Sequence, residues 1–336
     1  MKKSSKKRGN ISIFVPHAGC PHTCSFCNQR TITGSGKIPT GNDTAEIVKK
    51  ALEEYENPEE TEIAFFGGSF TAIDRKYMLE LLTCVQPFIG KNKFHGIRIS
   101  TRPDCIDREI LDILKKYNVT SIELGAQSMS EKVLLANERG HTAKQVENAC
   151  GLIREYGCFE LGLQMMVGLY KSSEEDEIFT FRKICELAPD TLRIYPVAIL
   201  EGTKLGELYK SGEYKTMEFD RVVDLCCDFL TEAEKRGIKV IKLGLHSSED
   251  VEKNLLGGFY HPAFREICQS VIYRRQLEEK IKEAGNPSEV EFVVAEKNLS
   301  KALGQKKSNI RYFKEQGIDV KITACKNFEK DFEMKI

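Results

Sequence analysis

The sequence predicts an α/β fold, an open partial (β/α)6 barrel followed by a small α/β region toward the C-terminal end. Short apolar segments alternate with longer amphipathic ones over the first 245 residues, which is typical of parallel β/α units. The units are too few for a closed eight-stranded barrel. Cysteine-rich and glycine-rich segments follow the first two strands, and such segments meet at one mouth of a β/α barrel.

Each predicted element rests on its own pattern of apolar residues. Short apolar runs predict strands at Ile11–Val15, Glu62–Phe66, Gly96–Thr101, Ser121–Leu124, Glu160–Met166, Thr191–Val197 and Ile238–Leu243. Apolar residues spaced three or four apart predict helices at Thr44–Glu56, Arg75–Phe88, Asp107–Tyr117, Thr142–Tyr156, Glu174–Leu187 and Glu218–Arg236. Right-handed crossovers would wind these units around one sheet.

The composition is that of a globular protein, with 41% hydrophobic and 30% charged residues among 336. Lys+Arg and Asp+Glu each number 50, so the net charge gives no case for nucleic acid or a membrane surface. No apolar run reaches the length of a membrane-spanning helix. Nine of the 12 cysteines are scattered, which favours a reducing cytoplasm over a disulfide framework. We therefore expect a cytoplasmic protein with no membrane partner.

The most informative segment is GCPHTCSFCNQRTITG, which carries Cys20, Cys24 and Cys27. In the spacing Cys-x3-Cys-x2-Cys, three thiolates can hold three irons of a [4Fe-4S] cluster and leave the fourth iron open. Phe26, directly before the last cysteine, fits this interpretation. A structural zinc site needs four ligands, so it would require His17 or His22 as the fourth. A lipoprotein signal is a further alternative.

This motif resembles the cluster-binding loop of radical S-adenosylmethionine (radical SAM) enzymes. The resemblance implies a [4Fe-4S] cluster whose open iron chelates the amino and carboxylate groups of S-adenosylmethionine (SAM). An electron from the reduced cluster then cleaves SAM to a 5′-deoxyadenosyl radical, which abstracts hydrogen from a substrate. It also implies a partner that donates electrons, such as flavodoxin or ferredoxin.

Gly67 and Gly68 follow the second predicted strand in FFGGSFTAI. Two adjacent glycines let a ligand approach the backbone closely. In radical SAM proteins this place binds the methionine ammonium group of SAM. Ser69 stands where the family often has an acid, so we expect backbone groups to make the contact. A simple turn is the alternative.

Polar residues after the fourth and fifth predicted strands form a further group of candidates. Glu123 and Gln127 in ELGAQSMS offer hydrogen bonds to ribose hydroxyls or to a carboxylate. Arg139 could pair with a carboxylate while touching no iron ligand. Gln127 and Arg139 resemble SAM-contacting residues of oxygen-independent coproporphyrinogen oxidases, and Gln164 takes the place of that branch's ribose-binding Asp. The alternatives are a helix cap at Gln127 and a surface ion pair at Arg139.

Three more segments resemble the Elongator catalytic subunit and its bacterial relatives, namely Ser100–Asp104, Arg193–Tyr214 and Gly257–Ser270. This resemblance implies a transfer RNA (tRNA) base as the substrate. We expect no acetyl-CoA-driven reaction, because the remaining length leaves no room for Elongator's acetyltransferase domain. Two other functions stay open, a coproporphyrinogen-oxidase-like or small-metabolite radical enzyme, and a non-catalytic RNA-binding or zinc-stabilised protein.

We expect a basic tail over residues 1–10, a radical SAM partial barrel over 11–245 and an accessory region over 246–336. Within the last region, residues 290–325 read as strand, helix, basic turn, helix and strand, an order that resembles a KH RNA-binding module.

The turn of this KH-like segment departs from the KH pattern at one position. Gly304 matches the first glycine of the Gly-x-x-Gly turn, but Lys307 replaces the second. Lys306 and Lys307 could compensate by contacting RNA phosphates. The alternative is a structural cap whose lysines are only solvated.

Overall fold

The computed structural model describes residues 9–15, 20, 24–28, 38–326 and 331–335. The basic segment Lys2–Arg8 and the alternative zinc ligands His17 and His22 lie outside the described residues. The chain forms two compact units, one of residues 1–216 with 236–259 and one of residues 217–235 with 260–336.

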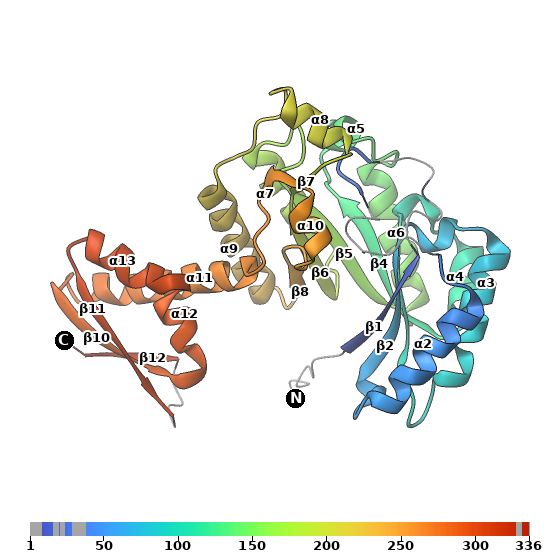
Figure 1. The fold of residues 1–336 in the computed structure, drawn as a ribbon, viewed down its shortest axis with the longest axis horizontal. Helices are drawn as coiled ribbons and strands as arrows, with labels where there is room; N and C mark the ends of the chain where they lie inside the picture. Colours follow the sequence, from blue (N-terminus) through green and yellow to red (C-terminus); the bar gives the residue numbers. More distant parts are fainter. Residues whose placement is uncertain (1–8, 16–19, 21–23, 29–37, 327–330, 336) are drawn as a thin grey trace. The chain divides into compact units, whose positions relative to one another are not determined.

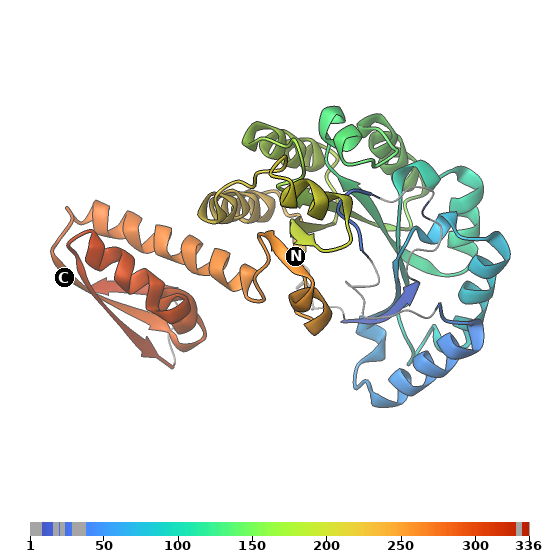
Figure 2. The same cartoon turned by 45° about the horizontal axis from the view of Figure 1, so that its top comes forward.

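The first unit is built on one parallel sheet in the order β1-β2-β3-β4-β5-β6-β8 (Figure 1). Its strands are β1 (Gly9–Val15), β2 (Thr61–Gly67), β3 (Gly96–Thr101), β4 (Val119–Gln127), β5 (Glu160–Val167), β6 (Thr191–Pro196) and β8 (Lys239–Leu243). The sheet curls into a half-barrel with helices along its outer side (Figure 2). The predicted α/β partial barrel is confirmed, but the sheet has seven strands instead of six because β8 pairs with β6.

Neighbouring residues of β2 and of β3 differ sharply in polarity although both are buried. Ile63 on β2 and Ile97 on β3 are fully buried and apolar, and they face away from the barrel interior. The residues beside them, Glu62 and Arg98, are equally buried and point inward. Continuous apolar runs would be expected for a strand covered on both faces, so the buried charged residues Glu62 and Arg98 are a specific feature of this sheet.

The first unit contains α2 (Gly41–Glu54), α3 (Arg75–Cys84), α4 (Arg108–Lys116), α5 (Glu131–Ala136), α6 (Ala143–Tyr156), α7 (Glu174–Glu186), α8 (Lys204–Lys210) and α10 (Glu249–Lys253). Capping side chains fix where several of them begin. Thr40, Thr142 and Ser173 each accept a hydrogen bond from the third residue of the following helix, whose side chain bonds back. A short antiparallel ladder joins β7 (Ala198–Leu200) to β9 (Leu255–Gly258), which the sequence did not predict.

The second unit contains α9 (Phe219–Lys235), α11 (Phe264–Glu283), α12 (Leu299–Leu303), α13 (Ser308–Glu315), β10 (Glu289–Ala295), β11 (Asp319–Cys325) and β12 (Phe332–Lys335). Its sheet has the order β11-β10-β12, parallel on one side of β10 and antiparallel on the other. Leu277, Phe292 and Phe313 lie in its core. Thus α9, which the sequence analysis assigned to the barrel, belongs to this unit.

Short 3-10 helices cover Pro58–Glu60, Phe70–Ala72, Gln86–Phe88, Pro103–Cys105, Glu296–Asn298 and Gln305–Lys307. No helix in the described part of the chain combines the length and apolarity needed to cross a bilayer.

The turn after β5 predicts a pH effect on stability. The Glu177 carboxyl is buried and accepts hydrogen bonds from Gly168 N and Ser172 Oγ, both at 2.7 Å. Burial raises the pKa of Glu177 to about 7 from an ordinary 4.5, so the folded protein binds this proton more tightly than the unfolded chain. The contribution of Glu177 to stability should therefore fall by about 3 kcal/mol as the pH rises from 4.5 through 7.

Urea unfolding of Glu177→Gln between pH 4.5 and 8 checks this expectation. Glutamine keeps the acceptor oxygen, so the variant should lose the decline, whereas Glu46→Gln on the surface of α2 should keep it. Equal slopes for Glu177→Gln and the unmutated protein would contradict the expectation.

Candidate functional site

A cavity of about 240 Å³ lies at the carboxyl ends of the strands of the first unit. The sequence analysis proposed eleven residues for binding the cluster or SAM. Nine of them line this cavity, namely Cys20, Cys24, Phe26, Cys27, Gly67, Gly68, Gln127, Arg139 and Gln164. The strands explain this gathering, because parallel strands end at the same edge of the sheet.

The loop that carries Cys24 and Cys27 is held by Ser25, which lies between them in the sequence. Ser25 donates from N and Oγ to the backbone and side-chain oxygens of Asn137, at 3.2 and 2.8 Å. Ser25 O accepts from Leu205 N at 2.7 Å, at the start of α8. Asn137 is fully buried and also donates to Tyr170 O at 2.9 Å. The loop is thus tethered by contacts that do not involve the cysteine sulfurs.

Two buried arginines lie beside the thiols. Arg139 NH1 donates to Cys24 Sγ at 3.0 Å, and NH2 donates to Gly125 O at 2.6 Å. Arg102 NH1 donates to Arg139 O at 2.8 Å, and the Asp104 carboxylate accepts from the remaining Arg102 nitrogens. The expectation that Arg139 touches no iron ligand is therefore wrong if Cys24 binds iron, since its guanidinium contacts that sulfur directly.

The surroundings of Cys20 and of His141 shift the pKa values of these two groups. Burial raises the pKa of Cys20, and the neighbouring Cys24 raises it further, whereas Arg102 and Arg139 oppose this. Burial lowers the pKa of His141 to about 4, and both arginines act in the same direction. His141 is accordingly a neutral imidazole near pH 7, with Nε2 near Gly125 O and Arg139 NH2.

The backbone and side chains of this cavity fit a ligand with several polar groups. Gly67 has φ 105°, a conformation that glycine adopts at little cost, and Gly68 N donates to Val15 O at 3.1 Å. Gln127 has φ 64°, and its buried Oε1 has no partner in the described structure. The same holds for Arg139 Nε. Unpaired buried polar atoms are costly, so two of them on one cavity favour a ligand that pairs with them.

The donor set also fits an iron–sulfur cluster. Three cysteines share one cavity, and no other thiol lines it within the described residues. No three His, Cys, Asp or Glu side chains of the described residues already form a complete metal-binding group. Thiolates repel one another and usually converge only when the metal binds. Three cysteines that share a cavity without forming a gathered ligand set are therefore compatible with cluster binding.

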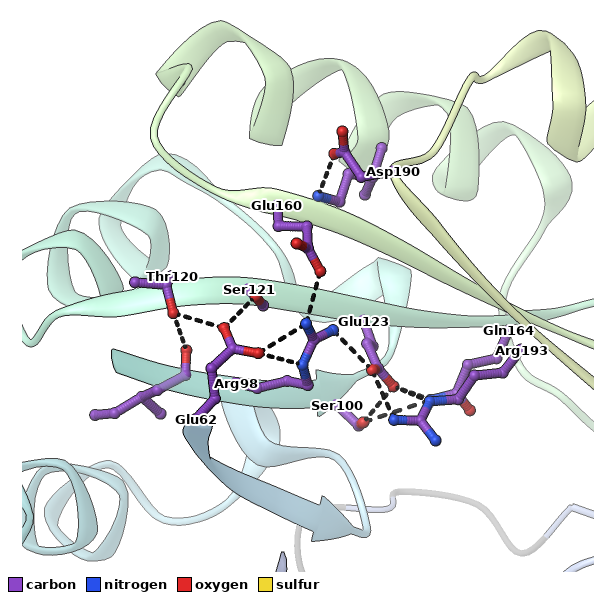
Figure 3. A network of polar contacts seen from close by, with 12 residues as sticks. Glu62, Arg98, Ser100, Thr120, Ser121, Glu123, Glu160, Gln164, Asp190 and Arg193 are labelled. Carbon is purple, nitrogen blue, oxygen red and sulfur yellow. Dashed lines mark hydrogen bonds and ion pairs between the residues drawn. The ribbon is translucent and has the colours of Figure 1, made fainter. Parts of the chain in front are cut away.

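Ser69 and Glu123 do not line the cavity. Ser69 is fully buried, where its Oγ pairs with Thr101 Oγ1 at 3.0 Å and accepts from Arg102 N at 3.2 Å. It therefore joins the ends of β2 and β3. Glu123 points into the buried ionic network on the inner face of the sheet (Figure 3).

A second cavity of about 460 Å³ adjoins the first. The two cavities share Phe26, Cys27, Gly67, Ser100, Gln127 and Gln164. Aromatic rings of Phe14, Phe66 and Tyr195 line the second cavity, as do the basic side chains of Arg193, Lys242 and His246. The Arg193 guanidinium lies 5.2 Å from the centre of the Phe66 ring.

The sequence analysis missed the roles of Asn137, His141 and Arg102. Arg102 lies in the quoted segment Ser100–Asp104, so the motif pointed to the region but not to the contact. Asn137 and His141 flank Arg139 in the sequence, yet their spacing carries no recognisable pattern, and only the fold reveals their contacts.

Comparisons with known proteins agree with this geometry. Residues 14–184 match the Radical SAM superfamily, and residues 189–274 match the Radical_SAM C-terminal domain. An uncharacterised protein of Methanocaldococcus jannaschii is 31% identical over 231 residues, which is 67% of each chain. Human Elongator complex protein 3 is 38% identical over 252 residues, covering 66% of this chain and 45% of the relative.

The solved structure of archaeal Methanocaldococcus infernus Elp3 aligns with a TM-score of 0.61 at 18% identity, covering 84% of this chain and 65% of that one. The chain spans less than half the length of the Elongator complex protein 3 sequences that it matches. The chain therefore belongs to the radical SAM superfamily, whose enzymes use a [4Fe-4S] cluster and SAM.

Proposed function

We propose that this protein is a radical SAM enzyme that modifies a base of tRNA. The second cavity carries the proposal, because it adjoins the cysteine-lined cavity and combines aromatic rings with basic side chains. Aromatic side chains stack on unpaired bases, and cations bind phosphate. Its volume lies within the range of about 300–1,000 Å³ that is usual for small-ligand pockets.

Cys20, Cys24 and Cys27 are the proposed cluster ligands. When bound, the cluster supplies the electron that cleaves SAM. Gly67 and Gly68 would offer backbone groups to the methionine end of SAM, while Gln127 Oε1 and Arg139 Nε would pair with other polar groups. Phe66 and Tyr195 would form the wall against which the base lies.

The relatives support RNA as the substrate class. They include Elongator complex protein 3 from yeast, at 30% identity, and a protein named tRNA uridine(34) acetyltransferase from Methanocaldococcus jannaschii, at 27% identity. The identities cover about two thirds of this chain.

Mass spectrometry of tRNA nucleosides with and without the gene tests the proposal. One modified nucleoside should disappear in the deletion strain, and the reconstituted enzyme should restore it with SAM and a reductant. An unchanged nucleoside profile would reject tRNA and return the small-metabolite alternative.

We expect Arg139→Ala to lower SAM affinity and to change the cluster as well. The variant loses a charged donor to Cys24 Sγ and exposes Gly125 O to an empty space. It also loses the proposed hydrogen bond between Arg139 Nε and SAM. A charge-assisted hydrogen bond contributes about 2 kcal/mol, so SAM affinity should fall roughly thirtyfold. The reduction potential of the cluster should also become more negative, because a cation beside a ligand sulfur stabilises the added electron.

SAM titration and a redox titration monitored by electron paramagnetic resonance measure the two effects of Arg139→Ala. Arg108→Ala is the matched control, since Arg108 pairs with Glu155 at the surface. If Arg139→Ala changes neither quantity, Arg139 supports only the fold.

We further propose that the segment 290–325 contacts the RNA backbone. At its turn a Cβ on Gly304 would clash with Ser308 Oγ, and Lys306 and Lys307 both have a left-handed backbone conformation. Both lysines and Arg311 are exposed. The strand, helix, helix and strand around the turn follow the order of a KH module.

The double variant Lys306→Glu/Lys307→Glu should lower tRNA affinity several-fold and flatten its dependence on salt, because fewer counterions are released. Cleavage of SAM without RNA should be unchanged. The control Lys115→Glu/Lys116→Glu makes the same charge change on α4 of the other unit. Equal tRNA binding by both double variants over a salt series would leave this segment a structural cap.

A further inference from the structure

A network of charged side chains lies on the inner face of the half-barrel (Figure 3). Arg98 on β3 is bonded to three carboxylates, with Glu62 Oε2 at 2.8 Å, Glu123 Oε1 at 2.9 Å and Glu160 Oε1 at 2.6 Å. Arg193 on β6 pairs with Glu123 through Nε at 2.8 Å and NH2 at 3.0 Å. The Glu123 side chain is 1% exposed, so no ligand in either cavity reaches it.

This network determines the orientation of one residue in the cavity wall. Gln164 Nε2 donates to Glu123 Oε2 at 3.0 Å and to Ser100 Oγ at 3.4 Å. A carboxylate only accepts hydrogen bonds. If the Gln164 amide rotated by half a turn, its carbonyl oxygen would face the Glu123 carboxylate, and two acceptors would meet with no donor between them. The amide is therefore held with Oε1 on the side away from Glu123.

Gln164 lines both cavities, so its free carbonyl oxygen belongs to the wall that they share. A neutral amide without such a partner could offer either an oxygen or an NH2 group to a ligand at similar cost. Here Glu123 removes that choice, and Arg98 and Arg193 hold Glu123 from two further strands.

We propose that Glu123 is a positioning residue that makes the shared wall a hydrogen-bond acceptor, so that Gln164 Oε1 selects a ligand bearing an O–H or N–H donor at that point. A ribose hydroxyl of SAM and a ribose hydroxyl or imino N–H of the RNA nucleoside both have this chemistry. The inference rests on the proposed assignment of the two cavities to SAM and the tRNA base. It replaces the expectation that Glu123 itself contacts the ligand.

Binding measurements on the cluster-loaded protein test the selection. The probes are SAM, its 2′-deoxy and 3′-deoxy analogues, and total tRNA. The unmutated protein should bind one deoxy analogue roughly three- to tenfold more weakly than SAM, the effect of one neutral hydrogen bond. Gln164→Met, of similar size but without hydrogen bonds, should bind that analogue and SAM equally. If Gln164→Met instead weakens only tRNA binding, the selected donor is on the RNA.

Glu123→Gln tests the positioning itself. The amide of Gln164 is then free to present either group, so discrimination against the deoxy analogue, or the tRNA effect, should fall below twofold. Because Glu123→Gln removes the carboxylate that pairs with Arg193, the charge-balanced variant Glu123→Gln/Arg193→Gln is measured for SAM if the single variant fails to fold.

Two results would overturn the proposal. One is equal behaviour of Gln164→Met and the unmutated protein with all probes. The other is full discrimination retained in the folded Glu123 variant, which would make Glu123 purely structural. The SAM measurements need no RNA, so a failure of the tRNA assignment in the nucleoside assay is distinguishable from a failure of this inference.

Discussion

Replacing Cys24 with alanine should abolish reductive cleavage of SAM while the half-barrel stays folded. Cys24 lines the first cavity, where its sulfur accepts a hydrogen bond from the Arg139 guanidinium. With two thiolates left, a [4Fe-4S] cluster would lack protein ligands for two irons instead of one. The loop itself should persist, because Ser25 tethers it to Asn137 and Leu205 without any contribution from Cys24.

Anaerobic reconstitution followed by iron analysis and measurement of 5′-deoxyadenosine tests the Cys24→Ala prediction. Circular dichroism and a thermal melt report whether the fold is retained. Cys158→Ala is the matched control, since Cys158 is exposed and lies away from the cavity-lining residues. A full cluster with normal 5′-deoxyadenosine yield in Cys24→Ala would remove Cys24 from the cluster ligands.

Much of the fold could be predicted from the sequence, because the outward-facing residues of the strands form regular apolar patterns. The predicted strand Gly96–Thr101 coincides with β3, and most other predicted strands differ from the observed ones by one or two residues at an end. Strand β4 extends to Gln127, beyond the predicted Leu124. The prediction stopped too early because Gly125, Ala126 and Gln127 carry no strand-like pattern. The ladder of β7 with β9 was missed since each strand has only a few residues.

The cavity-lining residues were also largely predictable, because most of them lie at or just after the carboxyl end of a strand. Their partners were not. Arg139 contacts Cys24, which lies 115 residues earlier, and Arg193 contacts Glu123 across 70 residues. Such contacts depend on how strongly the sheet curls, and no local pattern encodes that curvature. Glu123 illustrates the consequence, since a carboxylate near a strand end looks like a ligand-binding group until its buried partners are known.

The second large prediction concerns the ionic network. Arg98→Met should destabilise the first unit by about 3–5 kcal/mol, because it removes the cation that pairs with Glu62 and leaves that fully buried carboxylate without a counter-charge among the described residues. Although burial alone would raise it, Arg98 with Ser121 and Thr120 holds the pKa of Glu62 below its ordinary 4.5. The unmutated protein therefore gains stability from Glu62 above pH 4.5 and loses it as the pH falls through the lower folded value.

Arg98→Met should reverse this pH dependence, and the reversal separates a charge effect from a packing effect. Without the cation, burial dominates and raises the pKa of Glu62, so the variant should become more stable, relative to the unmutated protein, as the pH falls from 7 to 5.

Adding Glu62→Gln to Arg98→Met should restore part of the lost stability at pH 7. Arg75→Met, which breaks the exposed pair with Glu109, should cost less than about 1 kcal/mol. Urea unfolding at pH 5 and 7 compares the four proteins. If Arg98→Met were as stable as Arg75→Met at pH 7, the network would not hold the floor of the cavities, and its control over Gln164 would lose its physical basis.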